Sequence, residues 1–404
     1  MNALALRNRF ALVAALSLGP AVSNSFARFA YALMLPAMRA DLGLNYSQAG
    51  ALNTSNAIGY LAGALFAARY VSALGNRRLF SAGMIATVIG IIGSGLTGDF
   101  IVQLALRGVT GVGGAMVFIC GAVLASNVFP DRPKLASTAI AIYFGGAGAG
   151  ILLSGAGVPP LLALAGVSAW RTAWLAIGLV SALFAVFALW AARHIDEPST
   201  GARGVAWPVR AFRAALTSYF LFGAGYIAYM TFVVAWMMSH GRAALDVSLT
   251  WGMLGIATLL APLAWRVPRA RWGAATVLGA AGLVLAAGAA LPLIGTSRPM
   301  MLLSALLFGG AMFTAPAAVT DLVKTSLPKS SWGSAVSVFT FVFAIGQAIG
   351  PVLTGWLADL TQSLQAGLAG SIAILVAASI AAMRQRQLAT DAPVTTVTHA
   401  HAPR

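Results

Sequence analysis

The sequence predicts an all-α integral membrane protein with twelve transmembrane helices, and three observations lead to that fold class. Of the 404 residues, 59% are hydrophobic and only 8% are charged, whereas a soluble domain carries about 25% charged residues. Twelve segments are long and apolar enough to cross a bilayer, which takes about 20 residues of helix. The basic residues, which give a net charge of +16, gather on one side of the predicted membrane. This composition excludes a soluble globular protein and a disordered one.

The predicted spans follow one another with short connections, except between the sixth and the seventh. We place them near residues 10–36, 46–70, 77–97, 100–126, 135–161, 169–193, 212–238, 247–266, 272–295, 299–322, 333–358 and 362–384. The first span begins like a signal peptide, but its apolar run is too long and contains Arg28, so we expect an uncleaved helix. The predicted units are an N-terminal six-helix bundle (1–193), a cytoplasmic linker (194–211), a C-terminal six-helix bundle (212–385) and a cytoplasmic tail (386–404).

The 25 Lys and Arg residues sort by side when the amino terminus is placed in the cytoplasm. Two of them, Arg28 and Arg107, lie inside spans, and four lie on the outer side, namely Arg39, Arg171, Arg242 and Arg298. The others all fall on the cytoplasmic side, as the positive-inside rule requires. We therefore expect a multi-pass protein of the bacterial inner membrane with both termini in the cytoplasm. The net positive charge therefore reflects the membrane topology, and we expect no nucleic-acid partner.

The fifth and the eleventh span carry similar glycine patterns at a constant offset of 200 residues. One reads Gly146-Ala-Gly-Ala-Gly150, and the other reads Gly346-Gln-Ala-Ile-Gly350-Pro351. Small residues four apart let helix backbones approach closely, and parallel six-helix repeats are a known transporter plan. We assign Gly150, Gly350 and Pro351 to gating, with simple helix packing as the alternative.

Several motifs are similar to those of one transporter family. Arg107-Gly-Val-Thr-Gly-Val-Gly113 in the fourth span and the Gly346–Pro351 run in the eleventh resemble motifs of the major facilitator superfamily. The resemblance covers all twelve spans and implies the major facilitator fold and secondary transport by alternating access, with a central cavity between two pseudo-symmetric bundles. The string from Phe26 to Pro36 resembles the uncharacterised bacterial YbfB-type branch.

Two motifs depart from the family pattern. The loop after the second span keeps the family's basic pair, Arg77 and Arg78, which we assign to gating, but it lacks the usual Asp. In the fifth span Ile151 replaces the proline that would follow Gly150, so the drug-antiporter signature is incomplete.

Arg28 and Arg107 are the ionisable residues inside the predicted spans, where such residues point to a functional site. The nine carboxylates all fall in loops, tails or the last turns of spans. An unpaired buried guanidinium is costly and stays protonated, and a carboxylate fits it through two parallel hydrogen bonds. We predict an anionic substrate with Arg28 as its contact, and Arg107 as either a structural residue or a second contact.

Helical spacing places further polar and aromatic side chains toward the cavity that the resemblance implies. Asn24, Arg28 and Tyr31 share one helical face if the first span is an α-helix. The predicted substrate-binding set consists of Arg28, Asn24, Tyr31, Asn56, Tyr60, Arg107, Tyr143, Tyr226, Tyr229, Phe313 and Gln347. Packing is the alternative for each aromatic residue, and Pro316 predicts a kink in the tenth span.

Energy coupling and transport direction stay open at this stage. Asp321, near the end of the tenth span, is the best candidate for a titrating group, but the substrate can instead bring its own proton or exchange for a counter-anion. Efflux of a drug-like or siderophore-like compound is an alternative to uptake. A membrane-embedded enzyme is a less favoured class, because the charged residues assemble no catalytic set. We expect a monomer in the lipid bilayer with a small-molecule substrate and no cofactor or metal.

Overall fold

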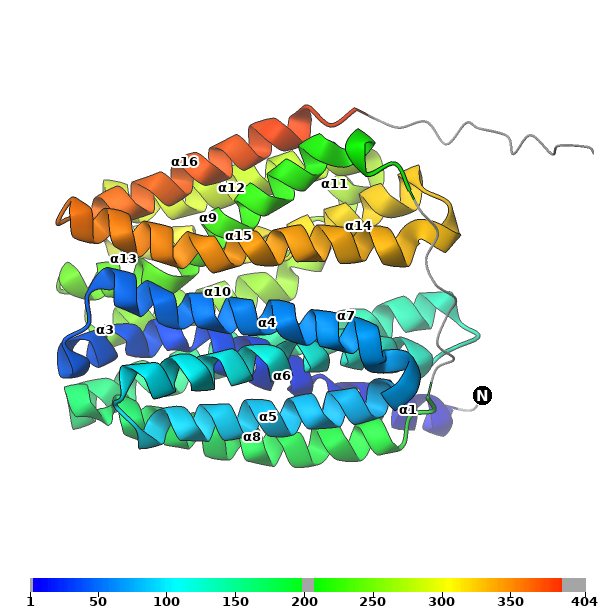
Figure 1. The fold of residues 1–404 in the computed structure, drawn as a ribbon, viewed down its shortest axis with the longest axis horizontal. Coiled ribbons are helices and arrows are strands. Elements are labelled where there is room, and N and C mark those ends of the chain that lie inside the picture. The colour runs from blue at the N-terminus through cyan, green and yellow to red at the C-terminus, as the bar shows by residue number, and fades with distance from the viewer. Residues whose placement is uncertain (1–2, 198–206, 387–404) are drawn as a thin grey trace, which may run out of the picture.

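The computed structural model describes residues 3–197 and 207–386, and within them it contains helices and short connections but no strand. Twelve helical segments of this part are long and apolar enough to cross a membrane, as the sequence predicts. The helices run along the long axis of the molecule and form two bundles (Figure 1). Residues 198–206 of the predicted linker and 387–404 of the predicted tail, with Arg203 and Arg404, lie outside the described residues.

The first bundle contains the spans up to the linker. Its first span is divided into α1 (Ala3–Leu16), α2 (Leu18–Pro20), the π-helix η1 (Ala21–Phe29) and α3 (Tyr31–Leu42). The remaining elements are α4 (Tyr46–Leu74), α5 (Asn76–Leu96), α6 (Phe100–Asn127), α7 (Pro133–Ala165), η2 (Val167–Ala169) and α8 (Trp170–Arg193).

The second bundle begins after the linker. It contains η3 (Val209–Phe212), α9 (Arg213–Ser239), α10 (Ala244–Ala264), α11 (Arg266–Arg271), α12 (Ala274–Ile294), α13 (Arg298–Met312), α14 (Thr314–Ser326), η4 (Lys329–Ser331), α15 (Trp332–Leu360) and α16 (Leu364–Met383). The tenth span breaks at Phe313, three residues before Pro316. A proline ring clashes with the carbonyl four residues earlier, here that of Met312, which accounts for the break.

The glycine repeat has the same packing role in both bundles. A methyl group on Gly150 of α7 would lie 2.6 Å from Ser25 Cβ in the first span. A methyl group on Gly350 of α15 would collide with the backbone of Ala224 in α9, the first helix of the second bundle. Hydrogen is therefore the only side chain that fits at either place, and each bundle packs its fifth helix against its first. The role of these glycines in gating stays a prediction.

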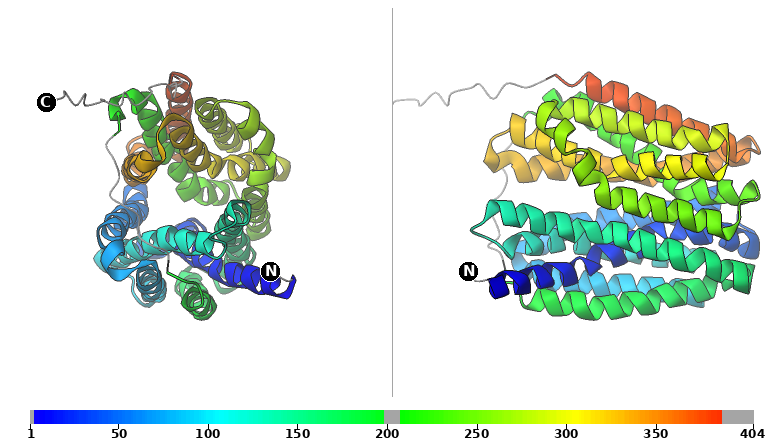
Figure 2. Two further views of the ribbon diagram at one scale, coloured as in Figure 1. Left: turned by 90° about the vertical axis from the view of Figure 1, so that its right-hand side faces the viewer. Right: turned by 180° about the vertical axis from the view of Figure 1, so that it is seen from behind.

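The two bundles contact each other mainly at one end of the molecule. We call the end where α8 finishes and η3 begins the linker end. The opposite end, where the bundles contact each other, is called the far end. The contacting pairs are α4 with α15, α7 with α10, and α3 with α9. Among the described residues, the hydrogen bonds that join the bundles all involve the first nine residues of α4. Viewed from the linker end, the helices of the two bundles surround the centre of the molecule (Figure 2).

Candidate functional site

Arg28 is a buried cation with free hydrogen-bond donors. It lies in η1 between the bundles, and only 5% of its surface is exposed. Its guanidinium carbon lies 5.5 Å from the centre of the Tyr60 ring and within electrostatic range of Tyr226 on α9 of the second bundle. Its Nε and Nη2 atoms have no hydrogen-bond partner among the described residues. Burying such donors unpaired costs free energy, which an acceptor brought by a ligand would recover.

Arg107 on α6 is just as deeply buried, at 1% exposure, but it is held by protein groups. Its Nη1 donates to the backbone carbonyl of Ala27, and its Nη2 donates to Asn53 Oδ1 at 3.3 Å. The Tyr31 ring centre lies 4.7 Å from the guanidinium carbon and a Trp174 ring centre 5.7 Å from it. These contacts tie α6 to the first span, α4 and α8, and they favour the structural interpretation of this residue.

The carboxylates that form ion pairs do so away from both of these arginines. The ion pairs between described residues are Arg171 with Asp41 at 3.5 Å, Arg269 with Asp321 at 2.8 Å and Arg298 with Asp246 at 2.6 Å. Asp321, the sequence candidate for coupling, therefore binds α11 near the linker end, and its side chain is about a third exposed. Arg28 remains with aromatic and amide neighbours instead of a carboxylate.

Five of the predicted residues belong to the neighbourhood of Arg28 or to the network beside it. Gln347 of α15 donates through Nε2 to the Tyr226 hydroxyl, and its Oε1 has no partner among the described residues. Asn56 donates through Nδ2 to the carbonyl of Arg107 at 3.2 Å. Asn24 lies buried in η1 with Arg28, and Tyr60 lies beneath the Arg28 guanidinium. The structure thus places Tyr60 and Tyr226 near Arg28, with Gln347 bonded to Tyr226 and Asn24 in the same π-helix, and it links Asn56 to Arg107.

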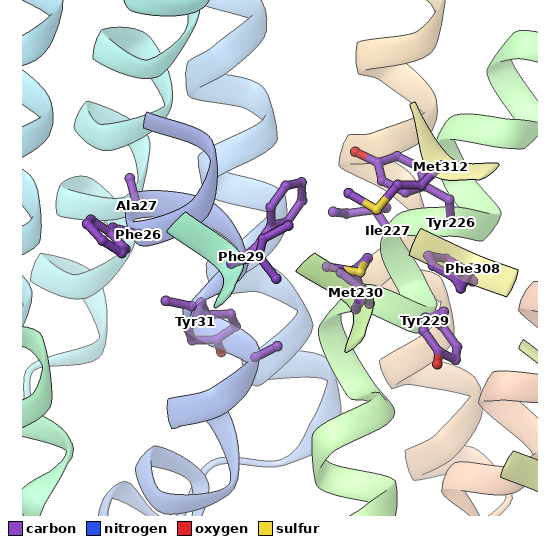
Figure 3. Close-up of a cluster of buried hydrophobic side chains, with 14 of the residues drawn as sticks. Phe26, Ala27, Phe29, Tyr31, Tyr226, Ile227, Tyr229, Met230, Phe308 and Met312 are labelled. Atoms are coloured by element: carbon purple, nitrogen blue, oxygen red, sulfur yellow. The ribbon is translucent and has the colours of Figure 1, made fainter. Parts of the chain in front are cut away.

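Each of three predicted tyrosines forms its hydrogen bond within its own bundle. Tyr143 donates to the carbonyl of Val117 at 2.7 Å, and Tyr31 donates to the carbonyl of Ala49 at 2.8 Å. Tyr229 shares a hydrogen bond with Ser304 Oγ at 2.6 Å and stacks on Phe308, with ring centres 4.0 Å apart. Figure 3 shows the two rings side by side. Phe313 is half-buried at the break between α13 and α14. These positions fit packing better than direct contact with a ligand.

The π-helix explains why Tyr31 and Arg28 have different neighbours. In η1 the N–H of Ala30 donates to the carbonyl of Ser25, five residues earlier, at 2.7 Å. This wider turn shifts the angular position of the residues that follow. The expectation that Tyr31 shares one α-helical face with Arg28 is therefore wrong, whereas Asn24 and Arg28 both lie within the π-helix. Arg28 lies beside Tyr60, whereas Tyr31 lies beside Arg107.

Two acidic residues have roles that spacing alone did not reveal. Glu197, at the start of the linker, accepts hydrogen bonds from the backbone N–H groups of Asn76 and Arg77, the latter at 3.1 Å. It thus caps α5 beside the loop that lacks the family's usual Asp. Arg77 also donates to the carbonyl of Ile195 at 2.6 Å, whereas Arg78 is exposed.

Asp359 joins the two bundles at the far end. Its carboxylate, in the last turn of α15, accepts the backbone N–H groups of Tyr46 at 3.0 Å and Ser47 at 2.8 Å, and the Ser47 hydroxyl at 2.6 Å. A helix start exposes N–H groups without intrahelical partners, so Asp359 caps α4 from the other bundle. The sequence places Asp359 near the end of a span, but it does not reveal which helix start the carboxylate faces.

The fold shared by solved transporters gives the class of this protein. The structure is similar to a bacterial homologue of the human lysosomal transporter Spinster in an inward-facing, unoccupied conformation, with a TM-score of 0.71, 16% identity and coverage of 93% of this chain and 96% of the other. It is also similar to a mutant of the nucleoside transporter NupG (TM-score 0.73, 12% identity, coverage 93% and 99%) and to a D-xylose–proton symporter (0.72, 13%, 93% and 97%). The protein therefore has the fold of the major facilitator transporters.

Sequence comparison gives the family within that class. Residues 21–383 match the family model described as "Uncharacterised MFS-type transporter YbfB", and the chain belongs to this family of multi-pass membrane transporters. Uncharacterised MFS-type transporters of Yersinia pestis (strain Pestoides F) and Yersinia pseudotuberculosis (strain YPIII) are each 29% identical to it over 170 residues. Each of these matches spans 42% of this chain and 42% of the relative. The resemblance inferred from the motifs is thereby confirmed.

Proposed function

We propose that this transporter moves a small organic anion across the bacterial inner membrane by alternating access, with Arg28 as the contact for the anionic group. The observation that carries the proposal is the contrast between two equally buried arginines. Arg107 has protein acceptors for both Nη atoms and leaves only Nε without a partner among the described residues, whereas Arg28 leaves both Nε and Nη2 without a partner there. Nε and one Nη atom form the edge of a guanidinium that binds a carboxylate through two parallel hydrogen bonds.

The position of Arg28 between the bundles suits a carrier. Tyr60 beside it belongs to the first bundle, and Tyr226 and Gln347 belong to the second. Binding energy gained there therefore depends on how the bundles sit relative to each other, as alternating access requires. With the basic linker end assigned to the cytoplasm, the far-end contacts close the site from outside.

Uptake of labelled organic anions into proteoliposomes tests this function. We expect saturable flux for at least one carboxylate, and Arg28→Ala should weaken its apparent affinity by about 30-fold or more, because truncating one member of a buried charge pair costs about 2–5 kcal/mol. Arg28→Lys should recover part of the affinity, since it restores the charge but not the two-pronged geometry. The matched control is Arg210→Ala, which removes an exposed positive charge.

Three outcomes would contradict the proposal. These are flux that Arg28→Ala leaves unchanged, a substrate range restricted to cations, and chemical turnover of the substrate without flux. The last outcome would favour the alternative of a membrane enzyme.

A further inference from the structure

Aromatic rings from both bundles lie on either side of the Arg28 neighbourhood. In the second bundle, Tyr226 of α9 and Phe343 of α15 have ring centres 5.7 Å apart and planes inclined by only 10°. Tyr219, two helical turns from Tyr226, stacks on the same Phe343 ring at 4.6 Å and 14°. Phe222 continues the stack to Tyr226 at 5.5 Å and 17°. The second bundle therefore presents a set of nearly parallel rings, which we call the ring stack (Tyr219, Phe222, Tyr226 and Phe343).

The first bundle contributes its own aromatic group. Tyr60 packs edge to face on Phe118, with ring centres 6.5 Å apart, and Phe118 packs on Phe144 at 4.6 Å. Tyr60 lies two turns beyond Asn53 on α4, and Asn53 donates a hydrogen bond to Thr231 of α9 at 2.6 Å, so the two aromatic groups are carried by helices that meet across the interface between the bundles. Phe118, Phe144 and Phe343 are only partly buried, which leaves part of their ring surface free for contact.

We propose that the site takes a carboxylate carried on a planar aromatic ring, the carboxylate on Arg28 and the ring against the ring stack. This proposal rests on the anion site of the proposed function and deepens it by naming the apolar part of the substrate. Stacked aromatic pairs are more stable than their buried area alone predicts, by about 0.5–1.5 kcal/mol. A flat ring gains this term on parallel protein rings, whereas a puckered aliphatic ring of similar size does not.

Equilibrium binding to the full-length protein in detergent tests the proposal with three probes of similar size. Benzoate has the ring and the charge, cyclohexanecarboxylate has the charge on a puckered ring, and benzyl alcohol has the ring without the charge. We expect benzoate to bind about 2- to 12-fold more tightly than cyclohexanecarboxylate, the range that corresponds to the stacking term. Benzyl alcohol should bind more weakly than both carboxylates.

Two variants locate the preference in the structure. Phe343→Leu should bring the ratio of the benzoate and cyclohexanecarboxylate affinities close to one, since it removes the central ring of the stack but keeps apolar bulk. Arg28→Ala should weaken both carboxylates alike and leave benzyl alcohol unchanged. Phe187→Leu is the matched control, because Phe187 is an exposed ring on α8, and it should leave the ratio at its wild-type value.

The outcomes separate this proposal from the function on which it rests. If both carboxylates bind through Arg28 with equal affinity, or if Phe343→Leu leaves the ratio unchanged, the aromatic proposal is overturned and the anion site stands. If neither carboxylate binds, or if Arg28→Ala binds them as well as the wild type, the anion site itself is wrong. Because the affinity ratio is first measured in the wild-type protein, the test does not depend on the folding of any variant.

Discussion

The regions around Arg28 and Arg107 show two ways of burying the same cation. Arg107 is surrounded by acceptors and rings from four helices, all within the first bundle. Arg28 lies where the bundles meet, with an aromatic face beside it and two donors that have no partner in the described part of the chain. We interpret the difference as follows: an arginine whose two Nη atoms both bond to its own bundle is structural, whereas one at the interface with Nε and an Nη atom unpartnered is suited to binding. Each prediction below changes matched residues in the two regions.

The largest difference is expected from removing the two arginines in turn. Arg107→Ala breaks two charge-assisted hydrogen bonds and leaves a cavity, so we expect it to lower the free energy of unfolding by about 3 kcal/mol or more. Arg28→Ala removes an unpaired buried charge, so the stability without ligand should stay unchanged or rise. Thermal unfolding of both purified variants in detergent measures this. Equal losses of stability would refute the distinction between the two regions.

A smaller difference is expected from the neighbouring asparagines. Asn53 accepts from Arg107 and donates to Thr231 Oγ1 of the second bundle at 2.6 Å, so Asn53→Ala should cost about 1–3 kcal/mol. Asn24 lies in η1 with Arg28, and its side chain makes no hydrogen bond to another described residue. Asn24→Ala should therefore leave the thermal midpoint close to the wild-type value. A larger loss for Asn24→Ala than for Asn53→Ala would show that the two regions are assigned the wrong way round.

The smallest difference is expected from the two tyrosines beneath the guanidinium groups. Tyr31→Phe keeps the ring beside Arg107 but removes the hydrogen bond to the carbonyl of Ala49, a loss of about 1 kcal/mol. Tyr60→Phe keeps the ring beside Arg28 and should change stability by less than that. Chemical denaturation of both variants, followed by tryptophan fluorescence, is sensitive enough for the comparison. A loss in Tyr60→Phe as large as that in Tyr31→Phe would reveal a bond at Tyr60 that the structure does not show.

The sequence predicted the parts of the fold that depend on local composition. The twelve spans follow from apolar runs, and the packing of Gly150 and Gly350 follows from a pattern that the chain repeats. It was also predictable that Arg28 forms no ion pair with a carboxylate in the described part of the chain, because all nine carboxylates lie in loops, tails or the last turns of the predicted spans.

Two kinds of information were not available from the sequence. Every residue of α9 from Phe222 to Met237 is buried, so periodicity could not show that Tyr226 faces the interface while Tyr229 faces Ser304. Contacts between distant segments were equally hidden. The cap that Glu197 provides for α5 joins residues about 120 apart, and the cap that Asp359 provides for α4 joins residues more than 300 apart.

The cap that Asp359 provides also bears on how easily the far end can open. The first turn of α4 divides its free N–H groups between two owners: Asn45 of its own bundle binds that of Gln48, and Asp359 of the other bundle binds those of Tyr46 and Ser47. All of these groups are at least partly exposed, so water can replace Asp359 at a small net cost. We therefore expect this contact between the bundles to form and break reversibly. A carrier that visits both an inward-open and an outward-open form needs the free energies of the two forms within a few kcal/mol of each other.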